Sequence, residues 1–184
     1  LDKNGVVDQN DVTQIGKSPY PEWYFSFGGK IAWKGFDLEV LFQGAAGMSV
    51  NILDNKNQVV AFVNNGNAYD IAKGAWAYYP EQGIDTRATA TYPRLTTQSN
   101  ENNYQTSSMW VKNADYLKLR NLELGYNFNA MKLQRAGVDN LRVYLSAHNL
   151  LTFSGLLKHY NMDPEKISGY PTIKSYNVGV SITF

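Results

Sequence analysis

The chain has 184 residues and a formal net charge of +1 at pH 7. The length favours a single domain. The nearly neutral charge argues against nucleic acid or an anionic lipid surface as the main partner. The sequence contains no cysteine, which excludes a disulfide framework, a thiolate zinc site and a cysteine nucleophile. Aromatic residues make up 14% of the chain and charged residues only 18%, a composition typical of β structure.

Acidic and amide side chains at the start of the chain follow the spacing of an EF-hand calcium loop, with Gly5 at the sixth loop position. The oxygen ligands are then Asp2, Asn4, Val6 (through its backbone carbonyl), Asp8 and Asp11. The first ligand would precede Leu1, and an aspartate closes the loop where the motif has a bidentate glutamate, which weakens binding. We expect a Ca²⁺ site here; the alternative is an Asn-Gly turn before a strand.

Two alternating strands follow, over residues 23–33 and 36–44. In both, large apolar side chains alternate with small or polar ones, which is the period of a strand with two different faces. The apolar face of the pair carries Trp23, Phe25, Phe27, Ile31, Trp33, Phe36, Leu38, Val40 and Phe42. Lys34 and Gly35 separate the two strands, which predicts a tight hairpin.

A long connection, roughly residues 44–109, carries three clustered aromatic residues, Trp76, Tyr78 and Tyr79. The C–H faces of sugar rings pack against aromatic rings, so these three side chains are candidates for substrate binding. The alternative is that they pack the loop itself or a partner surface.

Three further alternating strands are predicted over residues 116–128, 141–152 and 173–184. Within the first of them the apolar positions change parity, because Leu117 and Leu119 stand on odd numbers and the later leucines on even ones. This predicts a β-bulge, or the edge of the buried zone, near Arg120-Asn121.

The strand lengths and connections favour a membrane β-barrel. Strands of about 9–13 residues with alternately short and long links are typical of such barrels. Five charged strand residues share the polar side: Lys30, Asp37, Glu39, Glu123 and Arg142. A soluble sandwich also has alternating strands, but its water-facing side would carry more lysine and glutamate. Because an open sheet edge in lipid leaves backbone groups unpaired, we expect strand 173–184 to pair with a strand outside these 184 residues.

Short motifs along nearly the whole chain carry a family resemblance. They are Trp33–Leu38, Phe42–Gly44, Thr91–Leu95, Asn102–Asn103, Trp110, Asp115–Asn121, Leu124–Tyr126, Leu141–Tyr144, Asn149–Phe153, Asp163–Glu165, Tyr170–Thr172 and Ile182–Phe184. In this order they resemble the C-terminal segment of SusC/RagA-type TonB-linked outer-membrane transporters.

The resemblance implies an all-β fold, an antiparallel transmembrane β-barrel segment with long extracellular loops. Residues 23–184 would supply the last five strands of a 22-stranded barrel, and residues 1–22 an extracellular EF-hand-like loop. Such barrels are not enzymes; they import oligosaccharides or peptides across the outer membrane of Gram-negative bacteria. They work with a SusD-like surface lipoprotein and with TonB, which acts through N-terminal regions that nothing in this chain matches.

A second class of function is compatible with the same residues. A surface β-domain with a calcium loop would act as a binding or interaction module for a partner protein or a polysaccharide. Such a module would purify without detergent, whereas a barrel segment would not.

Overall fold

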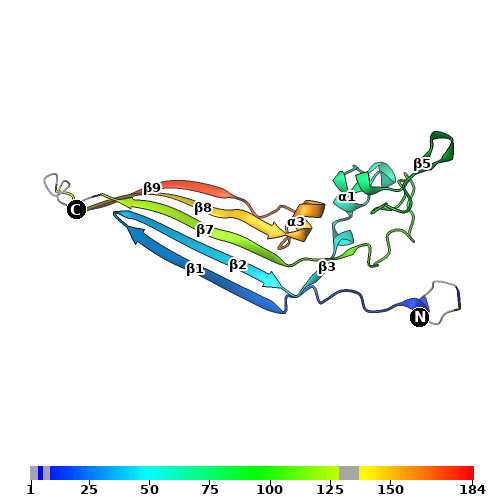
Figure 1. Cartoon of the computed structure of the whole chain (residues 1–184), viewed down its shortest axis with the longest axis horizontal. Coiled ribbons are helices and arrows are strands. Elements are labelled where there is room, and N and C mark those ends of the chain that lie inside the picture. The colour runs from blue at the N-terminus through cyan, green and yellow to red at the C-terminus, as the bar shows by residue number, and fades with distance from the viewer. Residues whose placement is uncertain (1–3, 6–8, 129–136) are drawn as a thin grey trace. The chain divides into compact units, whose positions relative to one another are not determined.

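The computed structural model describes residues 4–5, 9–128 and 137–184 of the chain. It divides into two compact units, which we describe separately (Figure 1). The sheet unit comprises Pro21–Gly47 and Ala114–Phe184, and the loop unit comprises Leu1–Tyr20 and Met48–Asn113. No helix among the described residues has the length and apolar character needed to cross a membrane.

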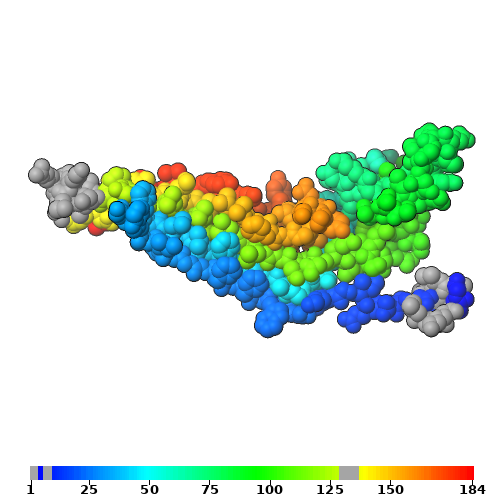
Figure 2. Space-filling model, in the orientation of Figure 1, coloured from blue at the N-terminus to red at the C-terminus, as the bar shows by residue number. Residues whose placement is uncertain are grey.

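A five-stranded antiparallel sheet makes up most of the sheet unit. Its strands are β1 (Trp23–Trp33), β2 (Phe36–Ala46), β7 (Tyr116–Asn127), β8 (Asn140–Ser154) and β9 (Ser175–Thr183). They are ordered β1-β2-β7-β8-β9, so that β1 and β9 form the two edges of this sheet (Figure 1). In Figure 2 the same strands form adjoining bands of colour along one face of the unit.

The strand register gives the sheet two chemically different faces. One row of paired positions crosses all five strands as Ile31, Leu38, Leu124, Leu145 and Val178. These side chains are between 37% and 77% exposed, so the sheet unit leaves this apolar face uncovered. We call it the apolar face.

The neighbouring row lies on the opposite side of the sheet. It crosses the five strands as Lys30, Glu39, Glu123, Ser146 and Asn177. Because successive residues of a strand point to opposite faces, the two rows show that the alternation seen in each strand is aligned across the whole sheet. We call this second side the polar face.

A β-bulge in β7 is present near Arg120, as the change of parity predicts. The register of β7 against β8 shifts between Leu119 and Asn121. Its register against β2 shifts at the same point, opposite Leu41 and Phe42 of β2. The extra residue brings Leu119 opposite Phe42, on the apolar face. It also places Arg120 among polar partners, which are described below.

The β1–β2 hairpin turns through two residues, as expected. Lys34 and Gly35 have φ angles of 49° and 91°, and Trp33 pairs with Phe36 across the turn. Positive φ at both central positions is the geometry of a type I′ turn, whose twist matches that of the flanking strands.

The loop unit consists of short elements packed around buried aromatic residues. In chain order they are η1 (Gln9–Asp11), β3 (Ser49–Asn51), η2 (Ile52–Asn55), α1 (Lys56–Val59), η3 (Val63–Asn65), η4 (Asp70–Gly74), β4 (Tyr78–Tyr79), η5 (Pro80–Gln82), β5 (Ile84–Asp85) and β6 (Val111–Asn113). The segment before β1 joins this unit, because the Ser49 amide donates to the Ser18 carbonyl at 3.0 Å.

Two residues from the family motifs form the centre of the loop unit. Tyr92 and Trp110 are buried and meet edge to face with ring centroids 5.8 Å apart. The Tyr92 hydroxyl accepts from the Ala61 amide at 3.0 Å and donates to the Val59 carbonyl at 2.6 Å. One buried phenol thus fixes the backbone that follows α1.

Candidate functional site

The three aromatic residues predicted to bind substrate line one hollow of the loop unit. Trp76, Tyr78 and Tyr79 surround a cavity of about 420 Å³ together with Arg94 and Leu95. We call it the aromatic hollow. Tyr78 and Tyr79 are half exposed, so their rings are accessible to a ligand.

Backbone hydrogen bonds hold these aromatic residues in place. The Trp76 amide donates to the Tyr92 carbonyl at 3.3 Å, which ties the hollow to the buried centre of the unit. The Ala77 amide donates to Thr86 Oγ1 at 2.8 Å, and the Thr86 amide donates back to the Ala77 carbonyl at 3.0 Å. These hydrogen bonds therefore hold the backbone segment that carries the three aromatic side chains.

Arginine side chains cover part of the aromatic surface. The Arg87 guanidinium lies 3.9 Å from the Tyr78 ring centroid, and that of Arg94 lies 5.8 Å from the Trp76 ring. Arg87 also donates to both carboxylate oxygens of Asp85, at 2.9 and 2.8 Å, which lowers the pKa of Asp85 to about 2. A sugar ring could stack only on the opposite face of Tyr78.

Two charged clusters lie on the polar face of the sheet unit. In the first, the Arg142 cluster, Arg142 donates to Asp37 at 2.5 Å and to Glu123 at 2.6 Å, and Asn127 donates to Asp37 at 2.8 Å. Asp37 is only 4% exposed. Gly125 lies beneath this cluster, and a Cβ there would approach the Arg142 guanidinium to 2.5 Å. The sequence placed these charges on one face, and the register brings them into contact.

The second group, the Lys118 cluster, joins motifs that are far apart in the sequence. The Lys118 ammonium is fully buried and donates to Asp163 at 2.8 Å, to Glu165 at 2.6 Å and to Thr172 Oγ1 at 3.2 Å. Arg120 donates to Glu165 as well. A buried charge is costly unless it is paired, so these contacts fix the chain that follows β8 onto the polar face.

The carboxylates of the Lys118 cluster are held in their charged form. Burial by itself raises the pKa of Asp163, but hydrogen bonds from Lys118, Thr172 and two backbone amides outweigh it and hold this pKa at about 2. Burial also raises the pKa of Glu165. Hydrogen bonds from Lys118, Arg120 and Tyr116 outweigh this effect, so the pKa of Glu165 is lowered as well. Carboxylates held this way act as structural anchors for the Lys118 and Arg120 side chains.

The expected calcium ligands fall mostly outside the described residues. Asn4 and Asp11 lie within them, whereas Asp2, Val6 and Asp8 do not. Among the residues that the structure describes, no group of three or more histidine or acidic side chains is placed to hold a metal ion. The calcium site stays a prediction.

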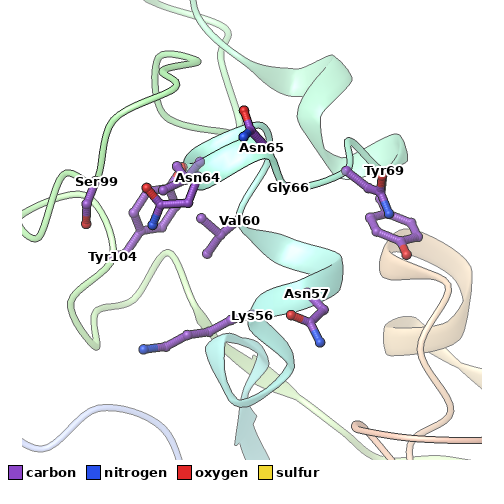
Figure 3. A pocket seen from close by; sticks show the side chains of 11 residues that line it. Lys56, Asn57, Val60, Asn64, Asn65, Gly66, Tyr69, Ser99 and Tyr104 are labelled. Carbon is purple, nitrogen blue, oxygen red and sulfur yellow. The ribbon is translucent and has the colours of Figure 1, made fainter.

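A second hollow of the loop unit was missed by the sequence reasoning. It measures about 600 Å³ and is lined by four asparagines: Asn57, Asn64, Asn65 and Asn67 (Figure 3). We call it the asparagine hollow. The density of asparagine between residues 55 and 67 was the signal that could have drawn attention to it.

Comparison with known proteins places this geometry in context. The chain is similar to TonB-dependent receptor P3 of Formosa agariphila, with 25% identity over an alignment that covers all of this chain and 18% of the relative. It is also similar to TonB-dependent receptor SusC of Bacteroides thetaiotaomicron, with 28% identity, covering 98% of this chain and 17% of SusC. No protein-family model matches the chain.

Solved structures agree with the sequence comparison. The structure of the RagAB peptide transporter matches with a TM-score of 0.70 and 26% identity, covering 94% of this chain and 18% of the solved one. The same importer in its closed-closed state matches with a TM-score of 0.69 and 25% identity. This chain is a relative of the SusC/RagA-type TonB-dependent receptors. It spans about a fifth of the length of these relatives.

The SusC/RagA resemblance confirms several expectations. The fold is all-β, and its antiparallel sheet matches the barrel portion of a TonB-dependent transporter. The relatives are named as receptors and as a peptide importer, which agrees with the expectation that this chain is not an enzyme. The motif residues that carried the resemblance now have structural roles, since Tyr92 and Trp110 form the core of the loop unit and Lys118 the centre of a charged cluster.

Proposed function

We propose that this chain forms part of the barrel wall and extracellular loops of an outer-membrane importer for oligosaccharides or peptides. The observation that carries the proposal is the apolar row Ile31–Leu38–Leu124–Leu145–Val178, which crosses all five strands and is left uncovered by the sheet unit. Exposure of so continuous an apolar face to water is unfavourable, whereas contact with lipid is not.

The polar face fits the lumen side of such a wall. Its charges are paired within the Arg142 and Lys118 clusters, and small residues leave room for the larger side chains. In this proposal the sheet supplies five of 22 strands in a barrel of a Gram-negative outer membrane. The loop unit lies outside the cell, where the aromatic hollow contacts the substrate and a SusD-like lipoprotein covers it, with TonB driving import.

Calcium is part of the same proposal. A Ca²⁺ ion held by the oxygen ligands of Asp2–Asp11 would order the segment before β1 on the extracellular side. Its test is described with the other residue-scale predictions in the Discussion.

Uptake by the native bacterium tests the importer. We expect deletion of the gene to abolish uptake of one class of fluorescent oligosaccharide or peptide, and affinity purification of the receptor from outer membranes to recover a lipoprotein. Tyr79→Ala should reduce uptake, because it removes an exposed ring of the aromatic hollow. Tyr20→Ala, which removes a still more exposed ring that does not line the hollow, is the control. Unchanged uptake in the deletion strain, or recovery of the protein in a soluble fraction, contradicts the proposal.

A further inference from the structure

Four side-chain amide groups that line the asparagine hollow are available to hydrogen-bond a ligand. The side chains of Asn57, Asn64, Asn65 and Asn67 all line it, and within the described part of the chain none of their amides makes a side-chain hydrogen bond. Lys56 is the single charged residue in the lining. Figure 3 shows the labelled side chains around the hollow, with Tyr69 and Tyr104 on opposite sides of the view.

The backbone that carries the side chains of Asn64 and Asn65 has an uncommon conformation. Phe62, Asn64 and Asn65 have φ angles of 63°, 51° and 60°. Asparagine adopts this left-handed region readily, but phenylalanine rarely does, so the surrounding structure must impose it. The backbone N–H of Asn64 donates to the backbone carbonyl of Thr97 at 3.2 Å. The backbone N–H of Phe62 donates to the backbone carbonyl of Asn67 at 3.4 Å. Such strain is concentrated at functional sites, where it fixes the groups that bind a ligand.

Tyr104, which also lines the hollow, is held in place by aromatic contacts. Tyr104 stacks on Trp110 with ring centroids 5.8 Å apart, and its hydroxyl lies 3.2 Å from that of Tyr92. Burial, and then the bond with Tyr92, raise the pKa of Tyr104, so its phenol stays neutral at physiological pH. The hollow therefore keeps its shape and its nearly uncharged lining.

The asparagine hollow and the aromatic hollow are linked through a third cavity, which shares lining residues with each of them. Tyr69 lines it and also lines a neighbouring cavity of about 460 Å³. That cavity in turn shares Ala72, Lys73 and Leu95 with the aromatic hollow. Lys73 pairs with Asp70 at 2.5 Å, which offsets its charge. The three cavities form a series along which a linear ligand could lie.

We propose that this series binds a linear, uncharged oligosaccharide, with one sugar ring in the asparagine hollow and later rings toward Trp76 and Tyr79. Each amide group both donates and accepts, which matches the adjacent hydroxyls of a sugar ring. A peptide would bring a terminal ammonium, and the one carboxylate that lines the three cavities, that of Asp70, is already paired with Lys73. This inference rests on the proposed importer function and names its substrate class.

Binding to the purified full-length receptor in detergent tests the inference by calorimetry. The probes are short linear glucans, mannans and xylans, with peptides of similar mass as the comparison. We expect at least one neutral oligosaccharide to bind and the peptides not to. Asn64→Gly should weaken that binding about tenfold, as expected for loss of a hydrogen-bonding amide. Glycine adopts the positive φ of Asn64 without strain, so the backbone is preserved.

Two controls separate the hollow from the fold and from the importer. Gln82→Ala removes an amide from η5, outside the hollow, and should leave binding unchanged. Binding that Asn64→Gly and Asn57→Ala both leave intact, or binding of peptides alone, overturns the inference. If cells import peptides while the receptor binds no oligosaccharide, the substrate class is wrong and the importer stands. If the receptor binds oligosaccharide through Asn64 but the deletion strain loses no uptake, the importer proposal fails instead.

Discussion

Lys118 shows how a single residue of the polar face can hold distant parts of the sheet unit together. Its ammonium has no access to water and meets two carboxylates and a hydroxyl from the segment that follows α3 (Gly155–Tyr160). With Arg120 the cluster contains two cations and two anions, so its charges balance. Removal of Lys118 leaves the buried Asp163 carboxylate without a cation, whereas Glu165 keeps Arg120.

Replacement of Lys118 by methionine tests this role. We expect Lys118→Met to destabilise the sheet unit by about 3–5 kcal/mol, because Asp163 loses its buried partner. The measurement is the midpoint of thermal unfolding, together with protease cleavage within residues 155–174. Lys158→Met, an equivalent change on the exposed side of α3, should leave both unchanged. Equal behaviour of the two variants would show that the cluster has no anchoring role.

Acid should release the same segment. The pKa of Asp163 is lowered from 3.8 to about 2 in the folded protein, so its stabilising effect is complete above the ordinary value and is lost as the pH falls through that interval. We therefore expect protease protection of residues 155–174 to fall between about pH 4 and pH 2. Asp163→Asn should weaken the protection at neutral pH and reduce its dependence on pH, because of the two carboxylates only Glu165 still titrates. Unaltered pH dependence in that variant would contradict the assignment.

The N-terminal loop gives a separate prediction for calcium. We expect the receptor to bind Ca²⁺ with a dissociation constant on the order of 10⁻⁴–10⁻³ M, as extracellular modules of this kind do, because aspartate replaces the bidentate glutamate. Asp8→Ala should abolish binding measured by calorimetry, whereas Asp54→Ala, an exposed aspartate outside the motif, should not. Calcium binding that survives both Asp2→Ala and Asp8→Ala would show that the Asn-Gly turn is the correct interpretation.

At the scale of elements, the strands could be read from the sequence because each of them carries two chemically distinct faces. The expected ranges differ from the observed strands by no more than two residues at any end. The bulge at Arg120 was also readable, since a change of parity has few other causes in a strand. The face a residue occupies follows from its parity alone, which is local information.

Residues of the loop unit were harder to interpret for a physical reason. Its short elements follow no period, and its shape depends on contacts such as those of the Tyr92 hydroxyl, between residues more than thirty positions apart. The motif around Lys118 was recognised but received no role, because Asp163 and Glu165 come from a distant segment. Trp76, Tyr78 and Tyr79 line one hollow, as expected for neighbours in the sequence, and their role in substrate binding stays a prediction.

Opposite faces of one strand should respond differently to the same substitution. Val178 and Asn177 are adjacent in β9, and their side chains point to the apolar and the polar face. We expect Val178→Arg to impair assembly into the outer membrane, at a cost of about 2–4 kcal/mol near the bilayer midplane. Asn177→Arg should be tolerated, because its row already contains charged residues. The measurement is the amount of receptor in outer-membrane fractions, and similar losses in both variants would invalidate the assignment of faces.

At the scale of the whole molecule, the sheet has an apolar side and two edges that must be accounted for together. β1 and β9 each have one pairing partner among the described strands, so each presents an unpaired edge there. In lipid such edges must be closed, because unpaired backbone groups cost several kcal/mol each. A barrel wall satisfies both requirements at once, since it closes the edges and exposes the apolar face only to lipid.

The structure of the complete receptor in lipid nanodiscs, determined by electron cryomicroscopy, tests this claim most directly. The account predicts that β1 and β9 each continue into an antiparallel ladder with a strand outside this sheet, and that the row from Ile31 to Val178 faces lipid. A sheet whose apolar row is instead buried against a second protein layer, with β1 or β9 left as a free edge, would contradict it.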